Sequence, residues 1–115
     1  MATGQPYTIT RYTVKEGREN AFKSAWENMA REAMRHYKIG GNPRLLQDPN
    51  NPRNVITYAE WIHLNDIQDW MQQPYFKEFV QTCQELCESI DRNVFNVVLD
   101  LPIKTPEFEK VKRGR

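Results

Sequence analysis

Hydrophobic and polar residues follow two different periods in the first forty or so residues of the chain. Residues 7–14 are almost all β-branched or aromatic, a composition typical of a strand. After Gly17 the apolar side chains recur every three or four residues, at Phe22, Ala25, Trp26, Met29, Ala30, Ala33 and Tyr37. This pattern predicts one amphipathic helix that starts near Arg18 and stops before Gly40 and Gly41.

Two more strands are expected in the middle of the chain. The first is short and covers residues 43–47, and the second covers residues 54–62, where β-branched and aromatic residues are dense. Between them, the segment at residues 48–52 consists of turn-forming Asp, Pro and Asn residues. Its length is typical of a hairpin loop, so the two strands are predicted to pair.

A second helical region is predicted to begin at Asn65 or Asp66 as the capping residue. Pro74 interrupts it, because proline cannot continue an existing helix but starts a new one well. The helical spacing then resumes at Phe76, Phe79, Val80, Cys83, Leu86, Cys87 and Ile90. A last strand is predicted over residues 93–101, and Pro102 ends it.

The expected order of elements, β-α-β-β-α-β, is that of a ferredoxin-like α+β fold, with both helices on one face of an antiparallel sheet. The other face is predicted to be apolar too, because the strands do not alternate cleanly between apolar and polar residues. Phe95 and Val97 point one way while Val94 and Val98 point the other. We therefore expect a homodimer that packs sheet against sheet, with Phe95, Val97 or their strand neighbours at the contact.

Composition and charge narrow the class of protein. The chain has 115 residues, 39% hydrophobic and 11% aromatic, which suits one folded domain rather than a disordered chain. Sixteen basic and fifteen acidic residues leave a formal charge of +1, which argues against a nucleic-acid partner. No apolar run is long enough to span a membrane, and residues 1–6 lack a signal-peptide core. We expect one cytoplasmic domain over residues 1–115, with its core at 7–101 and a charged tail at 102–115.

Few residues form a familiar catalytic pattern. His36 and His63 are not paired at metal-binding spacing and are expected at the ends of elements. Cys83 and Cys87 fall on the apolar helical stripe, so they are predicted to pack in the core, and no metal site is expected. Trp70 precedes the proline break at Pro74, and such an irregularity leaves space between helix and sheet. A cavity lined by aromatic residues at that point suits a planar aromatic ligand.

Five sequence features accompany this order of elements. They are Val14-Lys15-Glu16-Gly17 after the first strand, the turn at residues 48–52, Tyr58-Ala59-Glu60-Trp61, Trp70, and Pro74-Tyr75-Phe76 leading to Phe79. With them, the chain from about Tyr7 to Leu101 resembles the antibiotic biosynthesis monooxygenase (ABM) domains of the dimeric α+β barrel superfamily. The resemblance implies that fold and its homodimer.

The resemblance also implies a cofactor-independent monooxygenase. Members of this kind bind an electron-rich phenol, quinol or anthrone between helices and sheet, deprotonate it, and let O₂ oxidise it directly. Such a small aromatic substrate supplies its own electrons, so no cofactor is expected. The competing hypothesis is a binding or interaction domain that keeps the fold without the chemistry, because the sequence contains no clear general base.

On the enzymatic hypothesis, seven residues form the expected site. Trp70 is expected to form the cavity wall and orient the substrate, Thr10 to hydrogen-bond it, and Tyr58 to accept or donate a proton. The expected substrate-binding residues are Tyr12, Trp26, Phe79 and Val80. Tyr12 contributes a hydroxyl group and the other three contribute apolar lining.

The haem-degrading members of the same family are a poorer match. Trp61 and Trp70 have the spacing of that branch, but its axial histidine and its strand asparagine correspond here to Val80 and Thr10. No histidine occurs between residues 75 and 90. Because haem iron in that branch needs an axial imidazole, we expect no specific haem complex.

Overall fold

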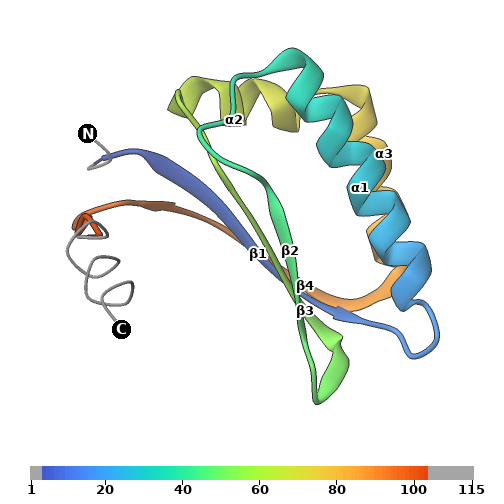
Figure 1. Ribbon diagram of the computed structural model, residues 1–115. Coiled ribbons are helices and arrows are strands. Elements are labelled where there is room, and N and C mark those ends of the chain that lie inside the picture. The colour runs from blue at the N-terminus through green and yellow to red at the C-terminus, as the bar shows by residue number, and fades with distance from the viewer. Residues whose placement is uncertain (1–3, 104–115) are drawn as a thin grey trace, which may run out of the picture.

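A four-stranded antiparallel sheet with helices on one face forms the fold (Figure 1), and the computed structural model describes residues 4–103. The strands are β1 (Pro6–Val14), β2 (Arg44–Asp48), β3 (Asn51–Glu60) and β4 (Cys87–Asn96), in the order β2-β3-β1-β4. The helices are α1 (Glu19–His36), α2 (Leu64–Met71) and α3 (Pro74–Leu86). This is the predicted ferredoxin-like α+β fold, with the second helical region divided into two helices.

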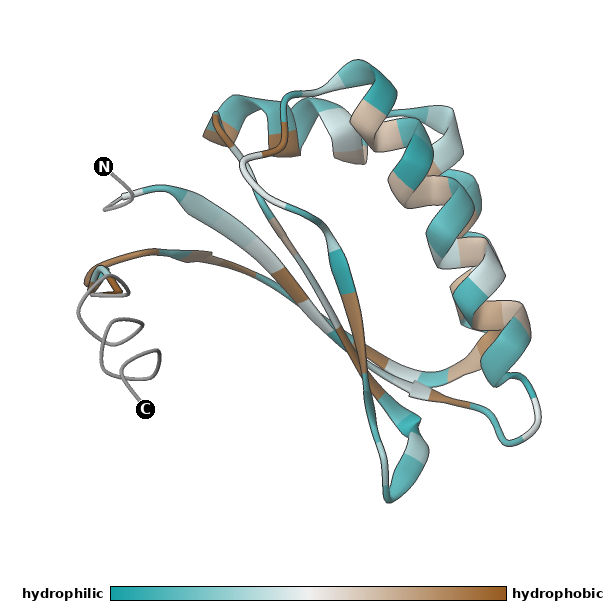
Figure 2. Cartoon of the chain, in the orientation of Figure 1, coloured by the Kyte–Doolittle hydropathy of each residue, from teal (hydrophilic) through white to brown (hydrophobic). Residues whose placement is uncertain are grey.

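The core lies between the sheet and the helices. Alternation along β1 buries Thr8, Thr10, Tyr12 and Val14 on the helix-facing side. The apolar stripe of α1 faces the sheet (Figure 2), and its Phe22 is almost completely buried. Trp61, just after β3, is the largest fully buried side chain. Periods of two and of 3.6 residues therefore produce the two layers, as the sequence predicts.

The proline break divides the second helical region as expected. Pro74 occupies the first turn of α3, and the main-chain N–H of Gln73 donates to the Trp70 carbonyl oxygen across the junction. The predicted caps are wrong, because the cap position of α2 is His63, two or three residues earlier, and His63 makes no side-chain capping bond. Within residues 4–103, no helix combines the length and apolar character needed to cross a membrane.

The last strand corrects the sequence prediction by about six residues. It covers Cys87–Asn96 rather than residues 93–101, and α3 ends at Leu86. Cys87 and Ile90 continue the helical spacing only by coincidence, since both lie on the helix-facing side of β4, where Cys87 is buried and Ile90 is half-buried. Pairing with β1 decides the boundary, because Val14 lies opposite Cys87. The predicted charged tail lies, from residue 104 on, outside the described residues.

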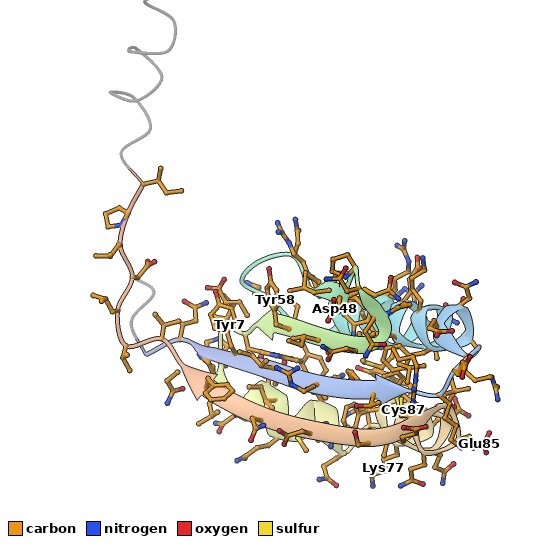
Figure 3. All side chains as sticks on the ribbon, turned by 90° about the horizontal axis from the view of Figure 1, so that it is seen from below. Tyr7, Asp48, Tyr58, Lys77, Glu85 and Cys87 are labelled. Atoms are coloured by element: carbon orange, nitrogen blue, oxygen red, sulfur yellow. The ribbon has the colours of Figure 1, made fainter. Side chains whose placement is uncertain are left out.

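The β2–β3 hairpin begins three residues earlier in β3 than predicted. Its turn is held by Asp48, whose carboxylate accepts a hydrogen bond from the Asn50 main-chain N–H at 2.8 Å. That bond and one from the Asn54 side chain lower the pKa of Asp48, which lies at the far end of the hairpin in Figure 3. The predicted turn segment is therefore present, and β3 pairs with β2 from its first residue.

The face of the sheet turned away from the helices, which we call the outer face, carries apolar side chains as the sequence predicts. Ile9, Ile56 and Tyr58 are half-buried there, while Leu46 and Phe95 are 47% and 52% exposed. Within the described chain no helix covers this face (Figure 1). An uncovered apolar face of this kind is typical of an interface.

Candidate functional site

The best-defined cavity lies between the sheet and the helix layer. The cavity is narrow: its volume is about 40 Å³, within a region of about 500 Å³ that is free of protein atoms and includes solvent at the open mouth. Its mouth lies where α1 approaches the start of β2, next to Trp26, Met34 and Pro43. Aromatic residues dominate its walls: Tyr12, Trp26, Trp61, Trp70, Phe76 and Phe79. A narrow slot with aromatic walls suits a flat, largely apolar ligand.

Trp70 forms the wall contributed by α2. Its ring packs between Trp61 and Phe76, with ring centroids 5.0 Å and 4.3 Å away. Although Trp70 is only 7% exposed, its indole N–H has no hydrogen-bond partner among the described residues. The N–H of Trp61, in contrast, donates to the Thr8 hydroxyl at 2.9 Å. Because buried donors are normally satisfied, the Trp70 N–H is available for an acceptor on a bound molecule.

Three hydroxyl groups line the floor of the cavity. Thr10 on β1 lies directly opposite Thr57 on β3, and both side chains are 5% exposed. Tyr12 is two residues further along β1, on the same face, and hydrogen bonds link its hydroxyl to both threonines. Burial raises the pKa of Tyr12 to about 12, so it is a neutral phenol at physiological pH. The floor can therefore orient a polar group but contains no ready base.

Among the described residues, Arg92 is the only charged residue that lines the cavity. It projects from β4, opposite Thr10 of β1, and its guanidinium carbon lies 5.2 Å from the centre of the Phe76 ring. No carboxylate within residues 4–103 forms an ion pair with it. The cation–π contact holds the guanidinium near the aromatic wall without neutralising it.

The cavity is therefore rich in hydrogen-bond donors and poor in bases. Among the described residues, no Asp, Glu, His or Cys lines it. Its cation, its indole N–H and its hydroxyls all favour an acceptor, above all an oxygen that bears negative charge. The arrangement can hold the anion of an acidic aromatic molecule, but it offers no strong side-chain base to form that anion.

Five of the predicted site residues gather around this one cavity: Thr10, Tyr12, Trp26, Trp70 and Phe79. Tyr58 borders it, but alternation along β3 turns its side chain to the outer face, where its ring lies 6.3 Å from that of Tyr7 (Figure 3). The expected proton-transfer role of Tyr58 stays a prediction. Val80 packs against the core but does not line the cavity, because it lies about 100° around α3 from Phe79.

Sequence reasoning missed Arg92 and Thr57. Thr57 could have been found, because it lies two residues from both Val55 and Ala59 and so shares their buried face. Arg92 could not, since the last strand was predicted to begin one residue after it. Only the pairing of β4 with β1 brings Arg92 beside Thr10.

The cysteines and histidines lie away from the cavity lining. Cys83 is 1% exposed, and its hydrogen bond with Cys87 together with burial raises the pKa of its thiol. His36 is exposed at the end of α1, near Glu32, and His63 is exposed before α2. Within residues 4–103, no three His, Cys, Asp or Glu side chains cluster closely enough to hold a metal ion.

The buried Tyr12 phenol predicts a loss of stability at high pH. Its pKa is about 12 in the folded protein and about 10 when exposed, so the unfolded chain loses this proton first. The stabilisation is fully present below pH 10 and declines as the pH rises toward 12, by up to about 3 kcal/mol. Urea unfolding between pH 9 and 11.5 should therefore give a shallower decline for Tyr12→Phe than for the unsubstituted protein. Equal slopes would contradict the assignment.

Comparisons with known proteins give one family and a set of similar folds. Residues 7–82 match the sequence model of the family described as antibiotic biosynthesis monooxygenase. No curated protein matches the chain significantly. SnoaB, a cofactor-independent oxygenase from Streptomyces nogalater, has a similar structure, with a TM-score of 0.76 and 19% identity over 87% of this chain and 99% of its own.

Two further structures illustrate how widely this fold is shared. A candidate antibiotic biosynthesis monooxygenase from Nitrosomonas europaea gives a TM-score of 0.75 at 16% identity, covering 89% of this chain and 98% of its own. A conserved protein from Methanosarcina mazei gives 0.74 at 14% identity, covering 83% and 94%. At these identities, the similarity of the structures establishes the fold alone.

Proposed function

Because the chain belongs to the antibiotic biosynthesis monooxygenase family, we propose that it is a cofactor-independent monooxygenase for a small aromatic substrate of the quinol or anthrone type. One observation carries the proposal: Arg92 and Trp70, whose indole N–H has no partner among the described residues, line the same aromatic cavity. Both groups donate hydrogen bonds, and such donors stabilise an oxygen on which negative charge develops. The oxygenase activity of the structurally similar SnoaB supports the proposal.

Arg92 and the hydrogen-bond donors of the cavity stabilise the deprotonated substrate, so its deprotonation does not require a strong side-chain base. A quinol or anthrone is weakly acidic, and a guanidinium beside the bound molecule lowers its pKa, as an opposite charge does for any acid. Arg92 thereby favours the substrate anion, whose proton leaves to solvent through the cavity mouth. Trp70 and the hydroxyls of Thr10 and Thr57 orient that anion. The aromatic walls exclude bulk water, which strengthens each of these interactions.

The proposed reaction balances without a further co-reactant. The anion transfers an electron to O₂, and the carbon radical and superoxide combine to form a carbon–oxygen bond. The resulting peroxide takes up a proton and then loses water, as its O–O bond and a C–H bond break, to leave a carbonyl. A CH₂ group and one O₂ thus give one C=O and one water. Substrate carbon is oxidised and oxygen is reduced, so the substrate supplies every electron.

Oxygen consumption tests the proposal directly. The purified protein is incubated with a panel of naphthohydroquinones and anthrones, and O₂ uptake is followed with an electrode. We expect uptake above the protein-free autoxidation rate for at least one substrate, with one atom of ¹⁸O from ¹⁸O₂ in the product. Trp70→Phe, which removes the indole N–H but keeps an aromatic ring, should lower that rate. If the protein raises O₂ uptake above the autoxidation rate for none of the substrates, the proposal is overturned.

A second candidate function is binding without chemistry. The absence of any carboxylate or imidazole from the described cavity lining favours it, because such groups are the usual general bases. The two candidates predict different results in the same experiment. A binding domain quenches Trp70 fluorescence on titration with the aromatic ligand but leaves O₂ uptake at the background rate.

The donor set does not fit haem, although the family includes haem-degrading members. Neither His36 nor His63 lines the cavity. The family resemblance implies that Val80, which cannot bind iron, corresponds to the axial histidine. The buried Cys83 thiol is a poor substitute, because its raised pKa disfavours the thiolate that iron binds. Titration of haemin into the protein should therefore give no saturable Soret shift at one haem per chain. A sharp shift lost in the His63→Ala variant would contradict this prediction.

We also propose that the protein is a homodimer whose outer faces pack together. Leu46, Ile56 and Phe95 give the outer face its apolar surface, and Arg11 and Asp91 add charges of both signs. A self-complementary face of this kind suits a two-fold interface. Sedimentation at micromolar concentration should give about twice the 13.7 kDa mass of one chain. A single monomeric species at that concentration would contradict the prediction.

A further inference from the structure

The cavity is too small in this structure for the substrate proposed above. Its volume is about 40 Å³. A cavity that holds a single benzene ring has a volume of about 150 Å³, and most small-molecule sites are larger still. A naphthol or an anthrone therefore needs space that the cavity lacks, and a side chain at its border has to move to provide that space.

More space lies directly outside the cavity mouth. A surface hollow of about 190 Å³, which we call the hollow, lies between α1 and the segment that precedes β2. Two of its lining residues, Glu27 and Arg31, form an exposed ion pair at 2.8 Å. The other four also line the cavity: Trp26, Ala30, Met34 and Pro43. The two spaces are thus neighbours, separated by the side chains that they share.

Among the four shared residues, Trp26 has the side chain whose movement joins the two spaces. Ala30 has only a methyl group, and the ring of Pro43 is fixed to the backbone. Met34 is already 46% exposed and has a flexible side chain, so it offers little resistance. The large indole of Trp26 is half-buried one turn before Ala30, on the same face of α1. Turning the indole outward therefore frees the most volume.

Trp26 is also held more weakly than the other two tryptophans. Trp61 donates a hydrogen bond to Thr8, and the rings of Trp61 and Trp70 pack together with their centroids 5.0 Å apart. Among residues 4–103, the Trp26 ring forms no aromatic pair and its N–H donates no hydrogen bond. A half-buried side chain without such contacts changes rotamer more readily than a fully buried one.

We propose that Trp26 is the gating residue of the substrate site and that the hollow is the outer half of this site. A substrate enters when the indole turns outward, and its ring system then spans both spaces. The inference rests on the proposed function, because it extends the site of the same flat aromatic substrate. The reacting end of the molecule lies in the cavity with Arg92 and Trp70, and the other end lies in the hollow near Arg31. The turned indole packs against that outer end.

A gating residue changes the rate of association as well as the rate of dissociation. If the open rotamer is a minor state of about 0.1–10%, the observed association rate constant is reduced to that fraction of its intrinsic value. Trp26→Ala removes the indole, so the association rate constant should rise about tenfold or more. The dissociation rate constant should rise as well, because the indole no longer packs against the ligand. A residue that only forms part of a wall changes dissociation alone.

Stopped-flow binding of 2-naphthol, a flat phenol, measures both rate constants. Its fluorescence is followed at several ligand concentrations, so that the slope of the observed rate gives association and the intercept gives dissociation. Trp26→Phe should raise the slope less than Trp26→Ala, because the benzene ring still blocks part of the mouth. The control, Tyr75→Ala, removes a half-buried aromatic side chain of α3 outside both spaces. It should change the slope by less than about a factor of two.

Three results of this experiment overturn the proposal. The first is an association rate constant in Trp26→Ala within about a factor of two of that of the unsubstituted protein, because the indole is then only a wall. The second is an equal rise in Met34→Ala, because the indole then does not control the passage. The third is failure of every protein to bind 2-naphthol. If Trp26→Ala does not fold, Trp26→Phe decides the same question.

The position of the indole in the bound protein gives a second, independent readout. The protein is labelled with 5-fluorotryptophan, and Trp26→Phe identifies the ¹⁹F signal of residue 26. Saturation with 2-naphthol should increase the H₂O/D₂O isotope shift of this signal, whereas the signals of the buried Trp61 and Trp70 should keep small shifts. An unchanged or smaller shift at residue 26 overturns the outward rotation. Neither measurement involves turnover, so absence of oxygen uptake contradicts the monooxygenase alone.

Discussion

Replacing Arg92 with methionine is expected to lower kcat/KM for substrate oxidation by a factor of about 100 to 1,000. Removing one preorganised donor from a developing oxyanion has an effect of this size. Methionine keeps an unbranched stem against the Phe76 ring, so the cavity wall is disturbed little. The expected loss therefore comes from the missing positive charge.

The pH profile distinguishes this role from a structural one. If Arg92 lowers the pKa of the bound substrate, kcat/KM rises with pH through that pKa. Without the cation the substrate loses its proton less readily, so the rise should move to higher pH by about one unit or more. Arg92→Lys, which retains the charge, should recover part of the rate and of the profile. A rate loss with an unchanged profile would show that the guanidinium only packs.

Arg18→Met is the matched control for this experiment. Arg18 is exposed at the start of α1, outside the cavity lining, and the substitution removes the same charge from the protein. Its kcat/KM should equal that of the unsubstituted protein within about a factor of two. A comparable loss in this variant would mean that the net charge matters rather than the position of the cation.

Local sequence patterns predict the helices and strands of both layers well, but they misplace the boundary between α3 and β4. The period of α1 and the position of Pro74 are strictly local signals, and both elements lie where they were expected. The start of β4 depends on β1, because a bulge between Thr13 and Val14 sets which residue Cys87 faces. No pattern within residues 76–101 carries that information, since Cys87 and Ile90 fit helix and strand equally.

The same limit explains which site residues the sequence could locate. Trp26, Trp70 and Phe79 lie on the apolar faces of their helices, so a helical period directs them toward the sheet and thus toward the cavity. Their proposed roles remain predictions. A strand residue can face either side, and the sequence alone does not decide which. This is why Tyr58 was included among the expected site residues, and why Arg92, which precedes the predicted start of the last strand, was not considered.

The second large effect is expected at Trp61, which is fully buried and lines the cavity. Trp61→Ala should lower the free energy of unfolding by about 4 kcal/mol, the usual cost of removing a fully buried tryptophan ring. Its ring packs against Tyr37 and Trp70, with centroids 5.9 Å and 5.0 Å away. Neither neighbour can fill the space left by the ring without moving, so a void remains in the Trp61→Ala variant. Urea unfolding measured for both proteins gives the difference directly.

The indole N–H of Trp61 should show the cost of an unpaired donor separately. Thr8→Val removes its acceptor and should cost about 1 to 3 kcal/mol, because the buried N–H is left without a partner. Trp61→Phe removes the donor but keeps an aromatic ring. Combined with Trp61→Phe, Thr8→Val should cost much less than it does alone, since no donor remains to be desolvated. A fully additive double variant would show that the 2.9 Å bond contributes no stability and that packing alone accounts for the Trp61 effect.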